Sequence, residues 1–237
     1  MKQYLLIGAS SGIAQALISI FQENPKVKLV SISRANIVTS SSQHVHFVSD
    51  YSISSVREIA SSLIASQSVF DYVLFFNGTL HHNQMMPEKQ VTQFSEEYYD
   101  HLTASNVYPH IRWFAELPRL LCRNSIAKII ILSARIGSIS DNRSGGWYSY
   151  RMTKAALNMA AKTFSLELNR PKSRAKVILF HPGTTDTALS KPFQKNIPKE
   201  KLFTPHFVAQ RLSALCDAEI EHTDIDFIDW RFNPIQW

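Results

Sequence analysis

Short apolar runs alternate along the chain with segments in which apolar residues recur every three or four positions. Such runs are typical of strands buried on both faces of a sheet, and the periodic segments are typical of amphipathic helices. The predicted strands are residues 3–7, 27–33, 45–48, 70–76, 127–132, 177–180 and 225–228. The predicted helices are one that starts after Gly12 and stops at Asn24-Pro25, then residues 53–65, 94–122, 147–168 and 205–216. Within 94–122, Pro109 and Pro118 predict kinks or breaks.

Strands that alternate with helices predict a parallel sheet covered on both faces. We therefore expect an α/β fold, a doubly wound parallel sheet of about seven strands with helices on both faces. The 237 residues contain no internal repeat and no linker rich in Pro, Gly or Ser, which predicts a single domain over residues 1–237. No apolar run approaches the ~20 residues that span a bilayer, so we expect no membrane-spanning segment and no membrane partner.

Composition excludes two further classes of protein. Apolar residues make up 45% of the chain and charged residues 19%, which argues against disorder. Two cysteines without metal or disulfide spacing favour a cytoplasmic location. The excess of 25 basic over 19 acidic residues fits an anionic ligand, but the basic residues are scattered among acids, so we expect no nucleic-acid partner.

A glycine turn follows the first predicted strand. Average usage predicts about 17 glycines in a chain of this length, whereas this chain has 7, so each one marks a place where the backbone has a special need. The segment Gly8-Ala9-Ser10-Ser11-Gly12-Ile13-Ala14 joins the strand to its helix. Its backbone N–H groups, at the positive end of the helix, suit a dinucleotide pyrophosphate. The alternative is a tight turn that binds no ligand.

The end of the second strand indicates which dinucleotide is bound. An NAD site usually has an acidic residue there, whereas this strand ends in Ser33-Arg34. Arg34 could pair with a 2′-phosphate, aided by the Ser33 hydroxyl, which favours NADP(H) over NAD(H). Arg34 could instead be a solvated loop residue. Asp50, after the third strand, could bind the adenine amino group or act only as a helix cap.

Tyr150 and Lys154 lie one helical turn apart on a predicted helix, so both side chains project from one face. A free tyrosine has a pKa near 10, and a nearby ammonium lowers it, so Lys154 would tune Tyr150 as a general acid and base. The alternative is an ordinary pair on a surface helix.

Several segments, in this order, resemble the short-chain dehydrogenase/reductase family over nearly the whole chain. They are residues 8–14, Asp50, Asn106, and residues 133–138, 150–154 and 182–187. Residues 87–89, 133–150 and 233–237 are most similar to the C-factor-like subgroup. The resemblance implies a single Rossmann-type domain, NADPH-dependent carbonyl chemistry and an Asn-Ser-Tyr-Lys tetrad.

The family's site residues can be assigned to positions in this sequence. Tyr150 would be the general acid/base, Lys154 would bind the nicotinamide ribose, and Asn106 would hold a water in a proton relay. The implied cofactor contacts are Gly8, Ser10, Ser11, Gly12, Ile13, Ser33, Arg34, Asp50, Tyr51, Asn77, Gly78, Tyr150, Lys154, Pro182, Gly183, Thr185 and Thr187. No metal site is expected.

The sequence departs from the family pattern at two places. Ala134 occupies the usual serine position, so Ser133 is the expected catalytic serine, with Ser138 as its rival and a site without serine as a third alternative. Because side chains alternate along a strand, Ser133 could reach the substrate only through a bulge or an early turn. The second departure is Phe75-Phe76-Asn77-Gly78, where the family usually has Asn-Asn-Ala-Gly.

The expected function is an NADP(H)-dependent oxidoreductase that transfers hydride between nicotinamide and a small carbonyl or alcohol substrate. The alternative is a C-factor-like nucleotide-binding signalling or regulatory protein with little turnover. Residues 188–202 are expected to form a mobile lid, and His181 is expected to serve packing. The resemblance also implies a homodimer or homotetramer through helices 94–122 and 147–168, and Trp113, Phe114, Leu117, Met152, Leu157 and Phe164 are expected to supply its apolar surface.

Overall fold

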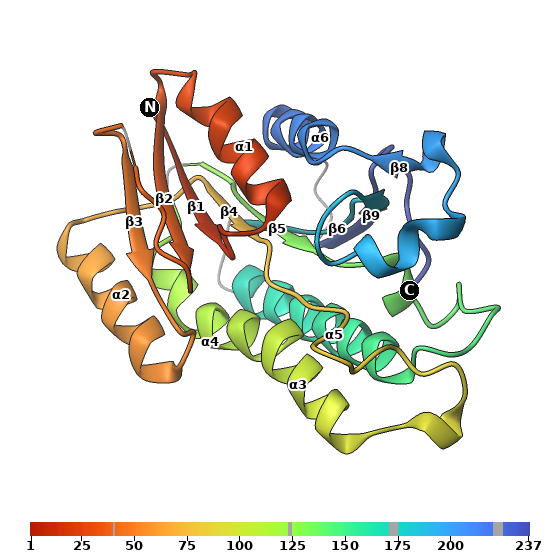
Figure 1. Cartoon of the computed structure of the whole chain (residues 1–237). Coiled ribbons are helices and arrows are strands. Elements are labelled where there is room, and N and C mark those ends of the chain that lie inside the picture. Colours follow the sequence, from red (N-terminus) through yellow and green to blue (C-terminus); the bar gives the residue numbers. More distant parts are fainter. Residues whose placement is uncertain (40, 123–124, 171–174, 220–224) are drawn as a thin grey trace.

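The computed structural model describes residues 1–39, 41–122, 125–170, 175–219 and 225–237. Within them a 7-stranded parallel sheet has the order β3-β2-β1-β4-β5-β6-β9 (Figure 1). Its strands are β1 (Lys2–Ile7), β2 (Val27–Ser33), β3 (His44–Val48), β4 (Tyr72–Phe75), β5 (Ala127–Leu132), β6 (Ala175–His181) and β9 (Ile225–Asp229). The predicted parallel sheet is confirmed, with strand ends displaced by at most a few residues.

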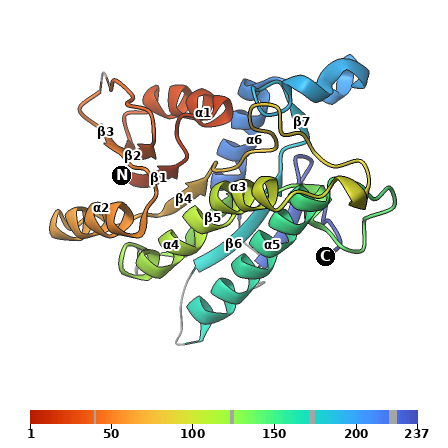
Figure 2. The same ribbon diagram turned by 60° about the horizontal axis from the view of Figure 1, so that its bottom comes forward.

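Helices cover both faces of the sheet, which confirms the doubly wound arrangement. α1 (Gly12–Gln22) and α6 (Pro205–Asp217) lie on one face, and α2 (Ile53–Ala65), α3 (Glu96–Asn106), α4 (Tyr108–Glu116) and α5 (Tyr148–Asn169) lie on the other (Figures 1 and 2). None of the described helices has both the length and the apolar character needed to cross a bilayer. The predicted helix 94–122 is interrupted at Val107, because Pro109 in the first turn of α4 has no N–H to continue the ladder.

The sheet has a topological switch point between β1 and β4. From β1 the chain proceeds through β2 to β3 on one side, and from β4 through β5 and β6 to β9 on the other. Helices leave the carboxyl ends of these two strands in opposite directions, which opens a crevice there. Gly8 makes the close approach possible, since its φ is +89° and a Cβ on it would lie 2.7 Å from the Asn77 nitrogen.

The side chains expected to form an oligomer surface mostly belong to the core instead. Trp113, Phe114, Leu117, Leu157 and Phe164 are buried between the sheet and the α4–α5 layer, because α4 packs directly on the sheet. That expectation was wrong for these five side chains, and Met152 is the one that is exposed. Other exposed apolar side chains on the two helices are Tyr108, Ile111, Met159 and Leu166.

Lys128, near the start of β5, connects α6 to the end of the sheet that lies opposite the crevice. Its buried ammonium donates to the carbonyl oxygens of Leu215 (3.1 Å), Cys216 (2.7 Å) and Ala218 (2.5 Å). These carbonyls end α6 and have no partner within the helix, and a cation at this end also complements the helix dipole.

Replacing Lys128 by Met is expected to lower the free energy of unfolding by about 2–3 kcal/mol, because buried carbonyls lose charged donors. Urea unfolding measures the change. The matched control is Lys2→Met, which removes the exposed Lys2–Asp217 ion pair (2.8 Å) at the same helix end. The Lys2→Met substitution should lower the free energy of unfolding by at most about 1 kcal/mol. Equal effects of the two substitutions would contradict the assigned role of Lys128.

Candidate functional site

A cavity of about 540 Å³ lies at the carboxyl ends of the central strands. Segments far apart in the sequence line it: the glycine turn, the ends of β4 and β5, the first turns of α5 and the segment after β6. Predicted site residues that line it are Ser10, Ser11, Gly12, Ile13, Asn77, Gly78, Ser133, Tyr150, Lys154, Pro182, Gly183, Thr185 and Thr187. Gly8, Ser33, Arg34, Asp50, Tyr51 and Asn106 do not line it.

The glycine turn presents the start of α1 to this cavity. Ser11 caps the helix, and its hydroxyl accepts a hydrogen bond from the Ala14 nitrogen (3.1 Å). The first turn contains no acidic residue, so the positive helix end is not neutralised there. A Cβ on Gly12 would lie 3.5 Å from the Thr187 methyl group, so the turn faces the segment after β6.

Tyr51 braces the glycine turn from behind. Its buried hydroxyl accepts from the Gly8 nitrogen (3.0 Å) and donates to the Ile32 carbonyl (3.0 Å). The side chain therefore ties three strand ends together and does not line the cavity. Its role in this structure is to position the turn.

Arg34 and Asp50 lie on the exposed rim beyond Tyr51. The Arg34 guanidinium is 5.9 Å from the centre of the Tyr51 ring and forms no ion pair or hydrogen bond with the described residues. The Ser33 hydroxyl donates to the Ala35 carbonyl (2.6 Å), which fixes the loop that carries Arg34. Asp50 accepts from the Ser52 nitrogen (2.8 Å), and this bond holds the pKa of its carboxyl below the ordinary range.

Tyr150 and Lys154 lie on the first turns of α5, with exposed fractions of 7% and 4%. The Lys154 ammonium is 5.9 Å from the centre of the Tyr150 ring and donates to the Leu132 carbonyl (3.1 Å). The Tyr150 hydroxyl forms no hydrogen bond with the described residues, which leaves it available to a ligand.

The expected lowering of the Tyr150 pKa is not found in the unliganded protein. Burial raises the pKa of Tyr150 and lowers the pKa of Lys154 to about 8. Removing both groups from water disfavours each charged form, and at this separation the desolvation outweighs their mutual attraction. Burial therefore favours the phenol form of Tyr150 and weakens the preference of Lys154 for its charged form.

Asn106, at the end of α3, holds the loop after β4 against α5. Its side-chain oxygen accepts from the Thr79 nitrogen (2.7 Å). Its amide nitrogen donates to the Thr79 carbonyl (3.0 Å) and to the Thr153 hydroxyl (3.1 Å). A Cβ on Gly78 would lie 3.3 Å from the Asn106 oxygen and 3.5 Å from the Lys154 nitrogen, so the three residues meet at one point.

The structure does not support either serine as the substrate's hydrogen-bond donor. Ser133 continues β5, so its hydroxyl points to α5 and donates to Asn158 (2.6 Å). No bulge turns it toward Tyr150, and Ala134 packs in the same apolar cluster as Tyr150.

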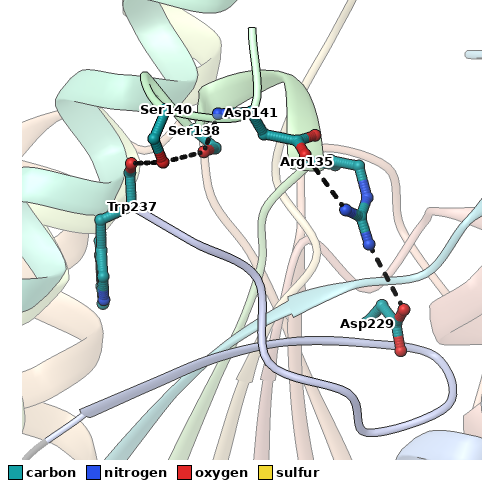
Figure 3. Close-up of polar contacts among 6 residues, drawn as sticks. All are labelled: Arg135, Ser138, Ser140, Asp141, Asp229 and Trp237. Atoms are coloured by element: carbon teal, nitrogen blue, oxygen red, sulfur yellow. Dashed lines mark hydrogen bonds and ion pairs between the residues drawn. The ribbon is translucent and has the colours of Figure 1, made fainter.

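Ser138 has a structural role in the loop after β5. Its hydroxyl accepts from the Asp141 nitrogen (3.1 Å) and lies 3.5 Å from the Ser140 hydroxyl, which in turn bonds the backbone oxygen of Trp237 (Figure 3). In the same loop Arg135 contacts Asp141 and Asp229, each at 3.4 Å. The loop is thus attached to the segment after β9, and Ser138 lies outside the cavity lining.

The segment after β6 closes the other side of the cavity. Gly183 has φ +74°, and a Cβ on it would lie 2.6 Å from the Phe203 ring. This glycine lets β7 (Thr184–Thr185) pair with β8 (Leu202–Phe203). The predicted lid, residues 188–202, contains the 3-10 helices η4 (Lys191–Asn196) and η5 (Lys199–Lys201) and ends at the first residue of β8. Within it, Phe193 packs on Trp147 with ring centres 5.0 Å apart.

Glu88 is a residue of this site to which the sequence analysis assigned no role. Its buried carboxylate accepts from the Ser149 nitrogen (3.2 Å) and from the Ser149 hydroxyl, and its backbone oxygen accepts from the Trp147 nitrogen (2.5 Å). It thereby caps the first turn of α5, immediately before Tyr150, and completes a cap that Trp147 does not provide with its own side chain. Glu88 lies 61 residues before Ser149 in the sequence, so no local capping pattern reveals this contact.

Glu88→Ala is expected to lower the free energy of unfolding by about 1–2 kcal/mol, the usual cost of a lost cap. Because it would displace Tyr150, the expected general acid/base, it should also lower kcat by about tenfold, since small misplacements of such a group are costly. Glu88→Gln keeps an acceptor oxygen and should retain most of the free energy of unfolding and most of kcat. Thermal unfolding and turnover measure the effects, with exposed Glu97→Ala in the first turn of α3 as the control. A Glu88→Ala protein that behaves like the control would contradict this role.

Comparison with known proteins places this geometry in a family. The profile of the short chain dehydrogenase family matches residues 2–198. A curated relative, 1-hydroxy-2-glutathionyl-2-methyl-3-butene dehydrogenase of Rhodococcus sp. (strain AD45), is 38% identical over 115 residues, which cover 45% of this chain and 48% of the relative. The match therefore spans about half the length of that protein. C-signal of Myxococcus xanthus is 33% identical over 123 residues, covering 52% of this chain and 68% of C-signal.

Solved structures share the fold over the full length. A short-chain dehydrogenase/reductase from Burkholderia multivorans with bound NADP has a TM-score of 0.80 at 22% identity, covering 100% of this chain and 99% of that one. Carbonyl reductase Sniffer of D. melanogaster has a TM-score of 0.83 at 17% identity, covering 100% of both chains. With the family profile spanning most of the chain, these findings agree with the motifs and the sheet order: the protein belongs to the short-chain dehydrogenase/reductase family of oxidoreductases.

Proposed function

We propose that this protein is an NADP(H)-dependent oxidoreductase that interconverts a carbonyl compound and an alcohol, with Tyr150 as general acid/base. The observation that carries the proposal is the shared cavity: Tyr150 and Lys154 line the same space as the glycine turn and the segment after β6. A proton donor and a dinucleotide cradle thus face one volume. The apolar lining near Tyr150 suits a small organic substrate.

The residues present fit a nicotinamide dinucleotide. The start of α1 is not neutralised by an acidic residue and suits the pyrophosphate, with Thr185 and Thr187 opposite it. Near Gly8 the buried side-chain oxygen of Asn77 has no hydrogen-bond partner among the described residues, and a ribose hydroxyl would supply the donor. When bound, the nicotinamide supplies or accepts the hydride.

The exposed rim that carries Arg34 and Asp50 supports a preference for NADP(H). The guanidinium of Arg34 has no competing acid among the described residues and sits on the loop fixed by Ser33. A 2′-phosphate is the group that a free guanidinium at this strand end would bind. Asp50 is exposed and could accept a hydrogen bond from the adenine amino group.

In the direction of reduction, the protonated phenol of Tyr150 would donate its proton to the substrate's oxygen. The ammonium of Lys154 would bond a ribose hydroxyl and stabilise the phenolate that remains. Asn106, through Thr79 and Thr153, would hold the loop and helix that frame this proton path.

The alternative function is a nucleotide-binding signalling or regulatory protein with little turnover. Two observations favour it: Ala134 stands in place of the usual serine, and one relative is named C-signal. Such a protein would keep the cofactor site and lose rate, because a missing hydrogen-bond donor costs on the order of 10²–10³ in turnover.

Thermal shift with NADPH and NADH, followed by turnover of a reactive aldehyde such as 4-nitrobenzaldehyde, tests the proposal. Stabilisation by NADPH with measurable turnover is the expected result. Stabilisation without turnover of any carbonyl probe would favour the regulatory alternative, and no binding of either coenzyme would contradict both.

The proposal includes a cytoplasmic location, supported by two free cysteines, and a homodimer or homotetramer. The exposed side chains Tyr108, Ile111, Met152 and Met159 on α4 and α5 would supply the contact. Sedimentation at micromolar concentration should give a dimer or larger species. A monomer would refute this part alone.

A further inference from the structure

The cavity contains a histidine that the proposed mechanism leaves unused. We propose that His181 donates the hydrogen bond to the substrate's carbonyl oxygen that Ala134 cannot provide. This inference depends on the proposed oxidoreductase function and names one more residue that contacts the substrate.

His181 lies next to Ser133, one residue before Ala134, the position that lacks a donor. It ends β6, and the Ser133 nitrogen donates to the Phe180 carbonyl (2.9 Å), which sets Ser133 and His181 next to each other at the carboxyl edge of the sheet. His181 lines the same cavity as Ala134, Tyr150 and Lys154.

The imidazole of His181 has hydrogen-bonding capacity to spare. Its Nδ1 atom is shielded and has no hydrogen-bond partner among the described residues. Its Nε2 atom is not shielded and forms no hydrogen bond with a described residue either, so Nε2 is the nitrogen that can donate into the cavity. The side chain is half-buried, and the cavity is the space that it reaches. A polar atom that is open to a cavity and has no protein partner is expected to meet a ligand or water.

Burial, more than the neighbouring charges, keeps His181 neutral. Burial, together with the cations Arg135 and Lys154, lowers its pKa to about 4, although Asp229 and Asp141 oppose the shift. A neutral imidazole carries one N–H, so it can donate to a carbonyl oxygen without adding a charge to the cavity. The other expectation, that His181 serves packing, does not account for a nitrogen that is open to the cavity and has no partner among the described residues.

Several other hydroxyl and imidazole groups at this end of the cavity already have acceptors. Ser133 donates to Asn158 (2.6 Å), Thr79 donates to the His81 carbonyl (2.9 Å), and His81 lies 3.2 Å from the Ala188 carbonyl through Nε2. The indole N–H of Trp147 is a rival donor, since the ring packs beside Tyr150.

The role of His181 requires no additional reactant. The reduced nicotinamide, when bound, would supply the hydride for the new C–H bond at the carbonyl carbon, and the π electron pair of the carbonyl would move to its oxygen. Tyr150 gives that oxygen its proton. The His181 N–H holds the same oxygen throughout and transfers no proton, so it lowers the barrier only by stabilising the developing negative charge.

The test uses five variants of the full chain: His181→Leu, His181→Gln, Ala134→Ser, the double variant His181→Leu/Ala134→Ser, and Trp147→Phe. NADPH affinity is measured by fluorescence titration, and kcat and KM are measured with 4-nitrobenzaldehyde. His181→Leu should lower kcat about 10²-fold and leave the NADPH Kd within about twofold, because one oxyanion donor is lost. His181→Gln keeps a hydrogen-bond donor, so its kcat should fall less than that of His181→Leu.

The double variant is the decisive arm, because a serine at position 134 restores a donor from the neighbouring strand. We expect the kcat of the double variant to be at least tenfold higher than that of His181→Leu, and we expect the single variant Ala134→Ser to raise kcat by a smaller factor than this. Unchanged kcat in His181→Leu, or a loss that follows NADPH binding and is not rescued by Ala134→Ser, would overturn the inference. So would a loss in Trp147→Phe with none in His181→Leu. A wild type that turns over no carbonyl would instead refute the proposed function itself, and the inference with it.

Discussion

Replacing Tyr150 by Phe is expected to lower kcat for carbonyl reduction by 10²–10⁴-fold, the usual contribution of a positioned general acid. The substitution removes one oxygen from a side chain that is 7% exposed and has no hydrogen bond to the described residues. The fold should therefore persist, and NADPH affinity should change little. Steady-state turnover of 4-nitrobenzaldehyde, with NADPH affinity measured in parallel, gives both quantities.

The matched control is Tyr148→Phe, which makes the same change two residues earlier on α5. Tyr148 is 37% exposed and does not line the cavity. Its loss of a hydroxyl should leave kcat within about twofold of wild type, as expected for a surface substitution. Equal rates in wild type and Tyr150→Phe would remove Tyr150 from the mechanism.

Replacing Arg34 by Ala is expected to weaken NADPH binding by about 10- to 150-fold and to leave NADH binding nearly unchanged. The reason is that a hydrogen bond to a charged group contributes about 1.5–3 kcal/mol, and only NADPH carries the 2′-phosphate. The ratio of kcat/KM with NADPH to kcat/KM with NADH should fall by the same factor. Fluorescence titration and turnover with each coenzyme measure it.

Lys28→Ala provides the control for net charge. Lys28 is exposed on the same strand, β2, near its opposite end, so the total charge changes equally while the rim of the cavity is untouched. Its effect on NADPH binding should be small and should vanish at high salt. If Lys28→Ala weakens NADPH binding as much as Arg34→Ala, then long-range charge and not a local contact sets the preference.

The fold was largely predictable because apolar runs and helical periodicity are both local features of the sequence. Apolar runs such as residues 127–132 correspond to strands, and their alternation with helical segments leaves few topologies open. The break at Val107 was also visible, since Pro109 carries its own physical reason. The burial of Trp113 and Phe114 was not, because periodicity shows that a helix has an apolar face but not how much of it the sheet covers.

The candidate site was predictable where spacing fixes geometry. Tyr150 and Lys154 share a helix face, and the glycine turn opens α1, as expected from the sequence alone. The direction of the Ser133 hydroxyl depends on where β5 ends, and a difference of one residue reverses it. The pKa of Tyr150 depends on burial, and the roles of Glu88 and His181 depend on contacts between distant segments; no local pattern encodes these.

A crystal structure with NADP⁺ bound tests the central claim most directly, since it shows what lies beside the nicotinamide ring. The account predicts the ring in the described cavity with the Tyr150 hydroxyl facing its reactive carbon, a ribose hydroxyl on the Lys154 ammonium and the 2′-phosphate on Arg34. A coenzyme bound elsewhere, or a nicotinamide ring separated from Tyr150 by protein side chains, would contradict it.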